Sequence, residues 1–272
     1  MSEMALTPES ALAQQVRYVR ELAAELPLIR YLAGSSLRVE SVNLWFGFLW
    51  WCLDPLLMML VYTLVVSVIL GRGTPNYPLF VMSAMLPWNF FVRATRNSIA
   101  DTRAKTRNMR QVAFPRAVVP LAASLAELVR AIAALGLFLV FAIPFGVYPS
   151  PTALLALPLL AALLVTTLGI AFFLSAFNLF VRDTERAMGH VFRLWMFLAP
   201  VLYSTQQVPA RFRLVFELNP FAEILEGFRS VLFLHQVPAF WPLAAATAGG
   251  LVALVLGFTF FVSTERAFAK LA

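Results

Sequence analysis

The stretch TALLALPLLAALLVTTLGIAFFLSAFNLFV, residues 152–181, contains no Asp, Glu, Lys or Arg. A helix of about 20 apolar residues is long enough to cross the hydrocarbon core of a bilayer. Similar blocks recur along the chain, which is 61% hydrophobic and 13% charged. A soluble domain carries about 45–50% apolar and about 25% charged residues. The sequence therefore predicts an integral membrane protein, and it excludes a soluble globular domain and a disordered chain.

Together with the other apolar blocks, this stretch predicts six membrane-spanning helices. The expected spans are Val42–Leu70, Leu79–Ser98, Ala117–Val147, Thr152–Val181, His190–Tyr203 and Trp241–Val262. No internal repeat, low-complexity tract or soluble domain stands apart from them. We therefore expect one all-α membrane domain over residues 1–272, with a cytoplasmic N-terminal segment at 1–41 and a six-span core at 42–265.

Positive charge is distributed unevenly among the segments that connect these spans. Of the 21 Lys and Arg residues, 16 lie in the N-terminal segment, the second and fourth connections and the tail, and 4 lie in the other connections. Short cytoplasmic loops carry an excess of Lys and Arg. Both termini are therefore predicted to be cytoplasmic. The net charge of +7 follows from membrane topology and does not indicate nucleic-acid binding.

The N-terminal segment contains an amphipathic pattern over residues 9–34. Its apolar positions recur at helical spacing opposite a polar face, and they are Leu12, Val16, Val19, Ala23 and Leu26. Such a helix lies on a membrane surface or on a partner. A plain solvated helix is the alternative.

Residues 204–240 are too polar for a span and too apolar for an ordinary loop. Two short amphipathic pieces, Leu214–Leu218 and Ile224–Phe233, flank Asn219-Pro220. Each is about half a membrane thickness long or less. They indicate re-entrant helices on the external side, or a cap that lies flat on the membrane surface.

Three charged residues inside the apolar blocks are candidates for function. Asp54 precedes Pro55, so the first span is expected to break or kink there, with Asp54 capping its second half; a kink without function is the alternative. Glu127 and Arg130 are three residues apart on one helix face and are expected to pair. Arg130 lies roughly 20 Å along the helix from Ala117, near the membrane midplane. Such a pair marks a functional site or a structural ion pair between helices.

Two further patterns allow two interpretations each. The segment DTRAKTRNMRQ, Asp101–Gln111, is strongly basic. It is either a positively charged membrane anchor that binds anionic lipid or a short helix inserted into a cytoplasmic partner. Aromatic residues gather in two places, at 45–51 and at 88–91. They form either interfacial belts or the lining of a path for sugars.

Several kinds of chemistry lack their motifs in this chain. It contains no GxxxxGK[ST] sequence, so ATP binding by a P-loop is not expected. HExxH, GxSxG and CxxC are also absent, and one cysteine with two histidines forms no metal-ligand pattern. Few acidic residues fall inside the apolar blocks, which disfavours an ion-coupled pump. The sequence therefore disfavours an enzyme or an ion-coupled transporter, and it indicates no metal or cofactor bound by this chain.

An ordered set of motifs resembles the membrane-spanning subunit of ABC-2 type polysaccharide exporters. The matching stretches are Leu49–Leu57 (LWWCLDPLL), Leu86–Phe91 (LPWNFF), Gln111–Leu121 (QVAFPRAVVPL), Asn178–Thr184 (NLFVRDT), Ala199–Ser204 (APVLYS), Val208-Pro209, Leu218–Phe221 (LNPF) and Phe228-Arg229. Together they cover about residues 38–265. Glu127 and Arg130 match no motif of this family.

The resemblance implies a homodimeric permease with two separate ATP-binding subunits, which would bind ATP and Mg on the cytoplasmic face. The N-terminal amphipathic helix would lie at the membrane interface, and residues 206–235 would form the external gate. For coupling to the ATPase, the resemblance implies Asp101, Arg103, Lys105, Arg107 and Arg110. For an aromatic glycan path, it implies Trp45, Trp50, Trp51, Phe192, Trp195 and Phe197. For the external gate, it implies Asn219, Pro220, Phe221 and Arg229.

We therefore expect a permease of the bacterial cytoplasmic (inner) membrane that exports a polyprenyl-diphosphate-linked polysaccharide, such as O-antigen or teichoic acid. The lipid diphosphate needs a cationic entry site, for which Arg30 and Arg38 are the candidates, because arginine matches phosphate geometry. Two alternatives remain open from the sequence. One is an ABC-2 permease for a drug or small lipid, and the other is a membrane enzyme that acts on polyprenyl lipids.

Overall fold

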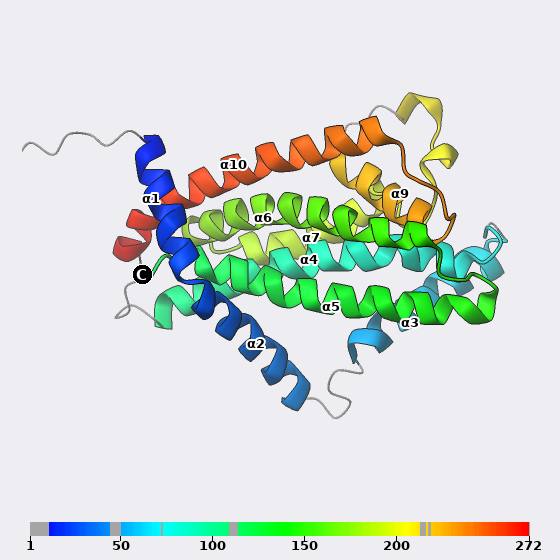
Figure 1. Cartoon of the computed structure of the whole chain (residues 1–272), viewed down its shortest axis with the longest axis horizontal. Coiled ribbons are helices and arrows are strands. Elements are labelled where there is room, and N and C mark those ends of the chain that lie inside the picture. Colours follow the sequence, from blue (N-terminus) through cyan, green and yellow to red (C-terminus); the bar gives the residue numbers. More distant parts are fainter. Residues whose placement is uncertain are drawn as a thin grey trace, which may run out of the picture.

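The computed structural model describes residues 11–43, 50–71, 73–108, 114–212, 216 and 219–271, and these residues form helices and connecting loops without any strand. The helices are α1 Ala11–Ala24, α2 Leu26–Asn43, α3 Trp50–Thr63, α4 Tyr77–Asn108, α5 Val118–Ala142, α6 Ala156–Phe180, α7 Thr184–Leu198, α9 Pro220–Leu232 and α10 Phe240–Leu271. Figure 1 shows the long helices running lengthwise through one bundle. α1 and the C-terminus of α10 lie at one end, called the α1 end here, and α9 lies toward the other, called the α9 end.

Three stretches of this bundle are long and apolar enough to cross a membrane. They are Val118–Phe145, Pro151–Phe180 and Phe240–Glu265. Each coincides with a predicted span, because apolar length alone was sufficient to identify it. A shorter apolar helix, Leu53–Ile69, lies where the first span was predicted. The all-α class is thus observed throughout the described part of the chain.

The first predicted span differs from expectation at Asp54. α3 continues through Pro55, so the prediction that Asp54 caps a new helix there is wrong. The Asp54 carboxylate instead accepts a hydrogen bond from Arg93 of α4. The irregular part of the span comes later, where Leu64–Ile69 forms a π-helix, η2.

Two other predicted spans also have different bounds in the structure. The second predicted span covers the first part of α4, which begins at Tyr77 and extends to Asn108 as one continuous helix. The basic residues 101–108 therefore form the end of this long helix and not a separate short one. α7 begins at Thr184 and ends at Leu198, because the backbone becomes extended at Ala199.

The N-terminal segment forms two helices, α1 and α2, instead of the single amphipathic helix that was predicted. Leu22 and Ile29 pack inward with residues of α5, α6 and α10. The predicted apolar positions Val16, Val19 and Leu26 are exposed on another face. Docking on the bundle therefore leaves an apolar stripe of α1 and α2 available to lipid.

A polar junction joins α1 to the C-terminal half of α10. The Gln15 side-chain amide donates to the Thr259 hydroxyl at 3.0 Å, across 244 positions of sequence. The Tyr18 hydroxyl accepts from the backbone N–H of Ala117 at 3.2 Å. Burial first, and then the Glu265 carboxylate to which it is hydrogen-bonded, raises the pKa of the Tyr18 phenol. Tyr18 therefore stays protonated, and the junction fixes α1 against the ends of α5 and α10.

α6 and α10 approach one another so closely that their backbones are in contact. A Cβ atom on Gly257 would lie 2.0 Å from the carbonyl oxygen of Gly169. A Cβ atom on Gly169 would lie 2.4 Å from the backbone nitrogen of Leu254. Small residues permit such close packing between helices in a membrane.

α4 lies at the centre of the bundle and touches α3, α5, α6, α7 and α9. Phe91 on α4, Phe138 on α5 and Phe228 on α9 are fully buried members of one apolar core. This core fixes the helices that carry the candidate functional side chains.

Candidate functional site

A buried ion pair lies on α5, within one of the helices long enough to cross a membrane. Glu127 is 3% exposed and Arg130 is 7% exposed, and their side chains form a salt bridge. The predicted pairing is therefore confirmed, because residues three apart on a helix face the same way. Asn97 of α4 donates a hydrogen bond to the Glu127 carboxylate at 2.7 Å. Sequence analysis missed Asn97, since no local pattern connects two residues that lie on different helices.

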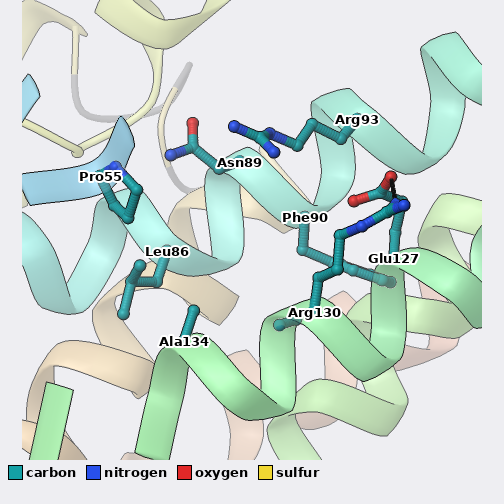
Figure 2. A pocket seen from close by; sticks show the side chains of 9 residues that line it. Pro55, Leu86, Asn89, Phe90, Arg93, Glu127, Arg130 and Ala134 are labelled. Atoms are coloured by element: carbon teal, nitrogen blue, oxygen red, sulfur yellow. Dashed lines mark hydrogen bonds and ion pairs between the residues drawn. The ribbon is translucent and has the colours of Figure 1, made fainter. Parts of the chain in front are cut away.

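A second ion pair lies next to the first, between α3 and α4. The Arg93 guanidinium donates to the Asp54 carboxylate at 2.7 Å, and both side chains are partly exposed. Figure 2 shows Arg93 and Asn89 of α4, Pro55 of α3 and the Glu127–Arg130 pair around one small pocket. Its volume of about 30 Å³ is enough for a water molecule.

A larger cavity lies on the other side of Arg130, between α2, α4 and α5. Its volume is about 590 Å³, and it is open on one side. The lining residues are Leu32, Ser35, Ser36 and Val39 of α2, Asn97, Asp101 and Lys105 of α4, and Ala123, Ala126 and Arg130 of α5. We call it the α2–α4–α5 cavity. This size is typical of ligand pockets, which measure about 300–1,000 Å³.

The predicted ATPase-coupling residues lie at the end of α4, near the α1 end of the bundle. Lys105 donates to the Asp101 carboxylate at 2.8 Å, one helical turn away. The Arg103 guanidinium donates to the backbone carbonyl of Arg182 at 3.4 Å, which joins α4 to the α6–α7 turn. The structure describes only the backbone of Arg107, and Arg110 lies outside the described residues.

The predicted glycan-path residues are found in different surroundings. Phe192 and Trp195 of α7 belong to a buried aromatic cluster, in which each packs against Phe91 of α4. Trp195 also contacts Phe221 of α9, with ring centroids 5.1 Å apart. This cluster joins α4, α7 and α9 of the chain.

The remaining aromatic candidates lie on α3 and α7 or outside the described residues. Phe197 is 57% exposed on α7. Trp50 begins α3 and is half-buried. Only the backbone of Trp51 is described, and Trp45 lies outside the described residues. The structure therefore brings Phe192 and Trp195 of this set into one cluster, and the role of the six residues in a glycan path stays a prediction.

The predicted external gate is a well-anchored helix, α9. The side-chain amide oxygen (Oδ1) of Asn219 accepts from the backbone N–H of Phe221, and Pro220 occupies the first helical turn. This is the arrangement expected at a helix N-terminus, where a cap satisfies a free N–H group and proline loses no hydrogen bond. Phe221 is buried in the aromatic cluster described above.

Arg229 of α9 holds the connection that follows α7. It is 1% exposed. One guanidinium nitrogen donates to the carbonyls of Pro200 and Val201, at 2.7 and 3.1 Å. The same guanidinium forms a 2.9 Å salt bridge with Glu226 and lies 3.9 Å from the centre of the Phe80 ring. Arg229 therefore joins α9, α4 and the end of α7 through one side chain.

The predicted diphosphate-entry residues, Arg30 and Arg38, both lie exposed on α2. No group of three His, Cys, Asp or Glu side chains that could hold a metal ion occurs among the residues with described placement.

Removing the Glu127 carboxylate is expected to destabilise the bundle strongly. Glu127→Gln leaves the buried Arg130 guanidinium without its counter-charge, which costs about 3–5 kcal/mol. The double variant Glu127→Leu/Arg130→Met removes both charges and should unfold close to the wild-type temperature. Glu21→Gln is the matched control, because Glu21 forms an exposed ion pair with Arg17 worth about 0.5 kcal/mol or less. Thermal unfolding in detergent measures all three, and equal losses in the single and double variants would contradict the expectation.

Comparison with known proteins places these features in a family. The family model described as ABC-2 type transporter matches residues 20–233. The chain is 30% identical to the O-antigen export system permease protein RfbA of Myxococcus xanthus over 257 residues, which is 94% of this chain and 99% of the relative. It is 26% identical to an O-antigen export system permease protein RfbA of Klebsiella pneumoniae over 245 residues, which is 90% of this chain and 94% of the relative. A second Klebsiella pneumoniae protein of that name matches to the same extent.

Proposed function

Because the chain belongs to the ABC-2 type transporter family, we propose that it is the permease subunit of an ATP-driven exporter of a polyprenyl-diphosphate-linked polysaccharide. The observation that carries this proposal is the similarity to O-antigen export permeases over nearly the whole length of both chains. The chain is a multi-pass membrane protein and a transport subunit. O-antigen is the first substrate to test, since the relatives are named for it.

Six spans are proposed for this permease. They are α3 with η2, α4, α5, α6, α7 and α10. The α1 end would face the cytoplasm and the α9 end the outside of the inner membrane. The excess of Lys and Arg in the connections at the α1 end supports this orientation, as does the placement of α1 and the C-terminus of α10 at the same end (Figure 1).

Two copies of the permease would assemble with two ATP-binding subunits, which would hold ATP and Mg. The proposed docking surface is the end of α4, with Asp101, Arg103 and Lys105 as its described side chains. The hydrogen bond from Arg103 to the carbonyl of Arg182 supports it, because it makes the α4 end and the α6–α7 turn parts of one surface. A movement of an ATP-binding subunit at this surface would be transmitted to α4 and α7 together.

The glycan would pass along aromatic side chains. It would leave the permease beside α9, which would act as a re-entrant gate on the external side. The contact of Trp195 with Phe221 supports a connection between α7 and this gate. Arg30 and Arg38, exposed on α2, would attract the lipid diphosphate, because a guanidinium group matches phosphate oxygens.

Deletion of the gene tests this function directly. We expect lipid-linked glycan to accumulate on the cytoplasmic face of the inner membrane and surface glycan to be lost. Complementation with the wild-type gene should restore export. The measurement is the amount of lipid-linked glycan on each face, which also identifies the sugar. Normal surface glycan without a cytoplasmic pool would contradict the proposal.

A further inference from the structure

No ligand has been proposed above for the α2–α4–α5 cavity, whose three walls differ in their chemistry. Two of its lining residues, Asp101 and Lys105, also belong to the proposed ATPase docking surface. α4 contributes a polar face, on which Asn97, Asp101 and Lys105 follow one another at four-residue spacing. Residues four apart lie above one another on a helix, so this face extends over about 12 Å at 1.5 Å per residue. The cavity wall on α4 is therefore polar along its length.

The other two walls are mainly small or apolar. α5 contributes Ala123 and Ala126, whose short side chains leave the space open, and then Arg130. α2 contributes Leu32 and Val39 on either side of two serines. The cavity thus offers apolar surface on one side and charged groups on the other.

Positive charge is present at two depths. Arg130 is nearly buried, and Asn97 helps to hold its partner Glu127 in place. Lys105 is partly exposed, in an ion pair with Asp101. An ammonium group has three donors and a guanidinium group has five, so each can donate to a ligand as well as to its carboxylate partner. Ser35 adds a hydroxyl donor between them.

This combination fits the head group of a lipid better than a sugar or a free anion. No aromatic ring is among the lining residues, whereas carbohydrate paths were predicted from aromatic side chains. A free phosphate would leave the apolar wall and most of the volume of about 590 Å³ unused. A lipid places its phosphate oxygens at the cations and its first methylene groups on Leu32 and Val39.

We propose that the α2–α4–α5 cavity binds the phosphate-bearing head group of a membrane lipid. Two sources carry this chemistry, the diphosphate of the glycan carrier and the phosphate of a bulk phospholipid. Only the carrier source rests on the proposed function. Lys105 and Arg130 donate to phosphate oxygens, Ser35 donates from α2, and the lipid chain leaves along the apolar wall of the open side.

Binding of defined lipids to the full-length chain in detergent tests this site. The probes are undecaprenyl diphosphate, dioleoylphosphatidylglycerol and dioleoylglycerol, titrated by native mass spectrometry. We expect the two phosphate lipids to bind, and dioleoylglycerol, which lacks phosphate, to bind about tenfold more weakly or worse, because a charge-assisted hydrogen bond is lost. Equal binding of all three lipids would overturn the proposal.

Variants of two cavity residues test whether the lipids bind in the α2–α4–α5 cavity. Ser35→Trp places a bulky side chain in the cavity. Lys105→Gln removes a partly exposed cation, whose ion pair with Asp101 contributes about 1 kcal/mol or less to stability. Both should weaken phosphate-lipid binding about tenfold. Arg211→Gln is the control, since Arg211 is an exposed cation stacked on Phe212 far from the cavity. Wild-type binding by both Ser35→Trp and Lys105→Gln would overturn the site.

Competition separates the two sources. Undecaprenyl diphosphate that displaces an excess of phosphatidylglycerol identifies the carrier as the ligand, and equal competition identifies bulk phospholipid. The result is independent of the deletion experiment. If a strain with Ser35→Trp exports glycan normally and the purified variant binds lipid as the wild type does, the cavity site is overturned and the proposed export function is unaffected.

Discussion

Gly257→Ala is expected to prevent α10 from packing against α6. The added Cβ atom would lie 2.0 Å from the carbonyl oxygen of Gly169, which belongs to the backbone and cannot rotate away. The two helices must separate, and the contacts along their whole length weaken together. The expected cost is about 3 kcal/mol or more, the range of large overpacking effects. The measurement is the yield of monodisperse protein in detergent and its unfolding temperature.

Gly249→Ala is the matched control for this change, because no atom lies within 4 Å of a Cβ at that position of the same helix. Alanine is favoured over glycine inside a helix by about 1 kcal/mol, so Gly249→Ala should be neutral or slightly stabilising. Gly169→Ala should repeat the effect of Gly257→Ala, since its Cβ meets the backbone of α10. Similar stability of the Gly249 and Gly257 variants would show that α6 and α10 do not pack in this way.

Arg229→Gln is expected to release the connection after α7 from α9 and to stop export. The change removes the donors that satisfy the carbonyls of Pro200 and Val201 and removes the counter-charge of Glu226. Breaking a buried, hydrogen-bonded ion pair costs about 3–5 kcal/mol. Unfolding temperature and surface glycan should both fall.

Arg229→Lys separates charge from geometry in the same position. Lysine keeps the positive charge but lacks the planar fork that reaches two carbonyls and stacks on the Phe80 ring. We expect an intermediate loss of stability and export. Arg211→Gln, at an exposed arginine nearby in the sequence, should change stability by about 0.5 kcal/mol or less. If Arg229→Gln unfolds at the wild-type temperature, the anchoring role is refuted.

The parts of the fold that could be predicted are those that local sequence determines. Apolar length alone identified the helices now seen as α5, α6 and α10. The spacing of Glu127 and Arg130 was sufficient to predict their ion pair, because helix geometry relates residues three apart. The predicted amphipathic piece Ile224–Phe233 corresponds to α9, which begins earlier, at Pro220.

The parts that could not be predicted depend on contacts between distant segments. Asn97 and Glu127 are 30 positions apart, and Arg93 and Asp54 are 39 apart. Asp54 was predicted to cap a helix because it precedes proline. However, α3 begins before Asp54, and the Asp54 carboxylate accepts a hydrogen bond from Arg93 of α4. The α2–α4–α5 cavity likewise needs three helices in position, and none of its walls has a motif that suggests a pocket.

The junction between α1 and α10 also determines an order of events during synthesis. Gln15 emerges from the ribosome 244 positions before its partner Thr259. At about 5–20 residues per second, roughly 12–50 seconds separate the two. The contact between α1 and α10 therefore forms only after the last span has been made. The exposed stripe with Val16 and Val19 provides a surface on which α1 can rest in the lipid head groups while the rest of the chain is made.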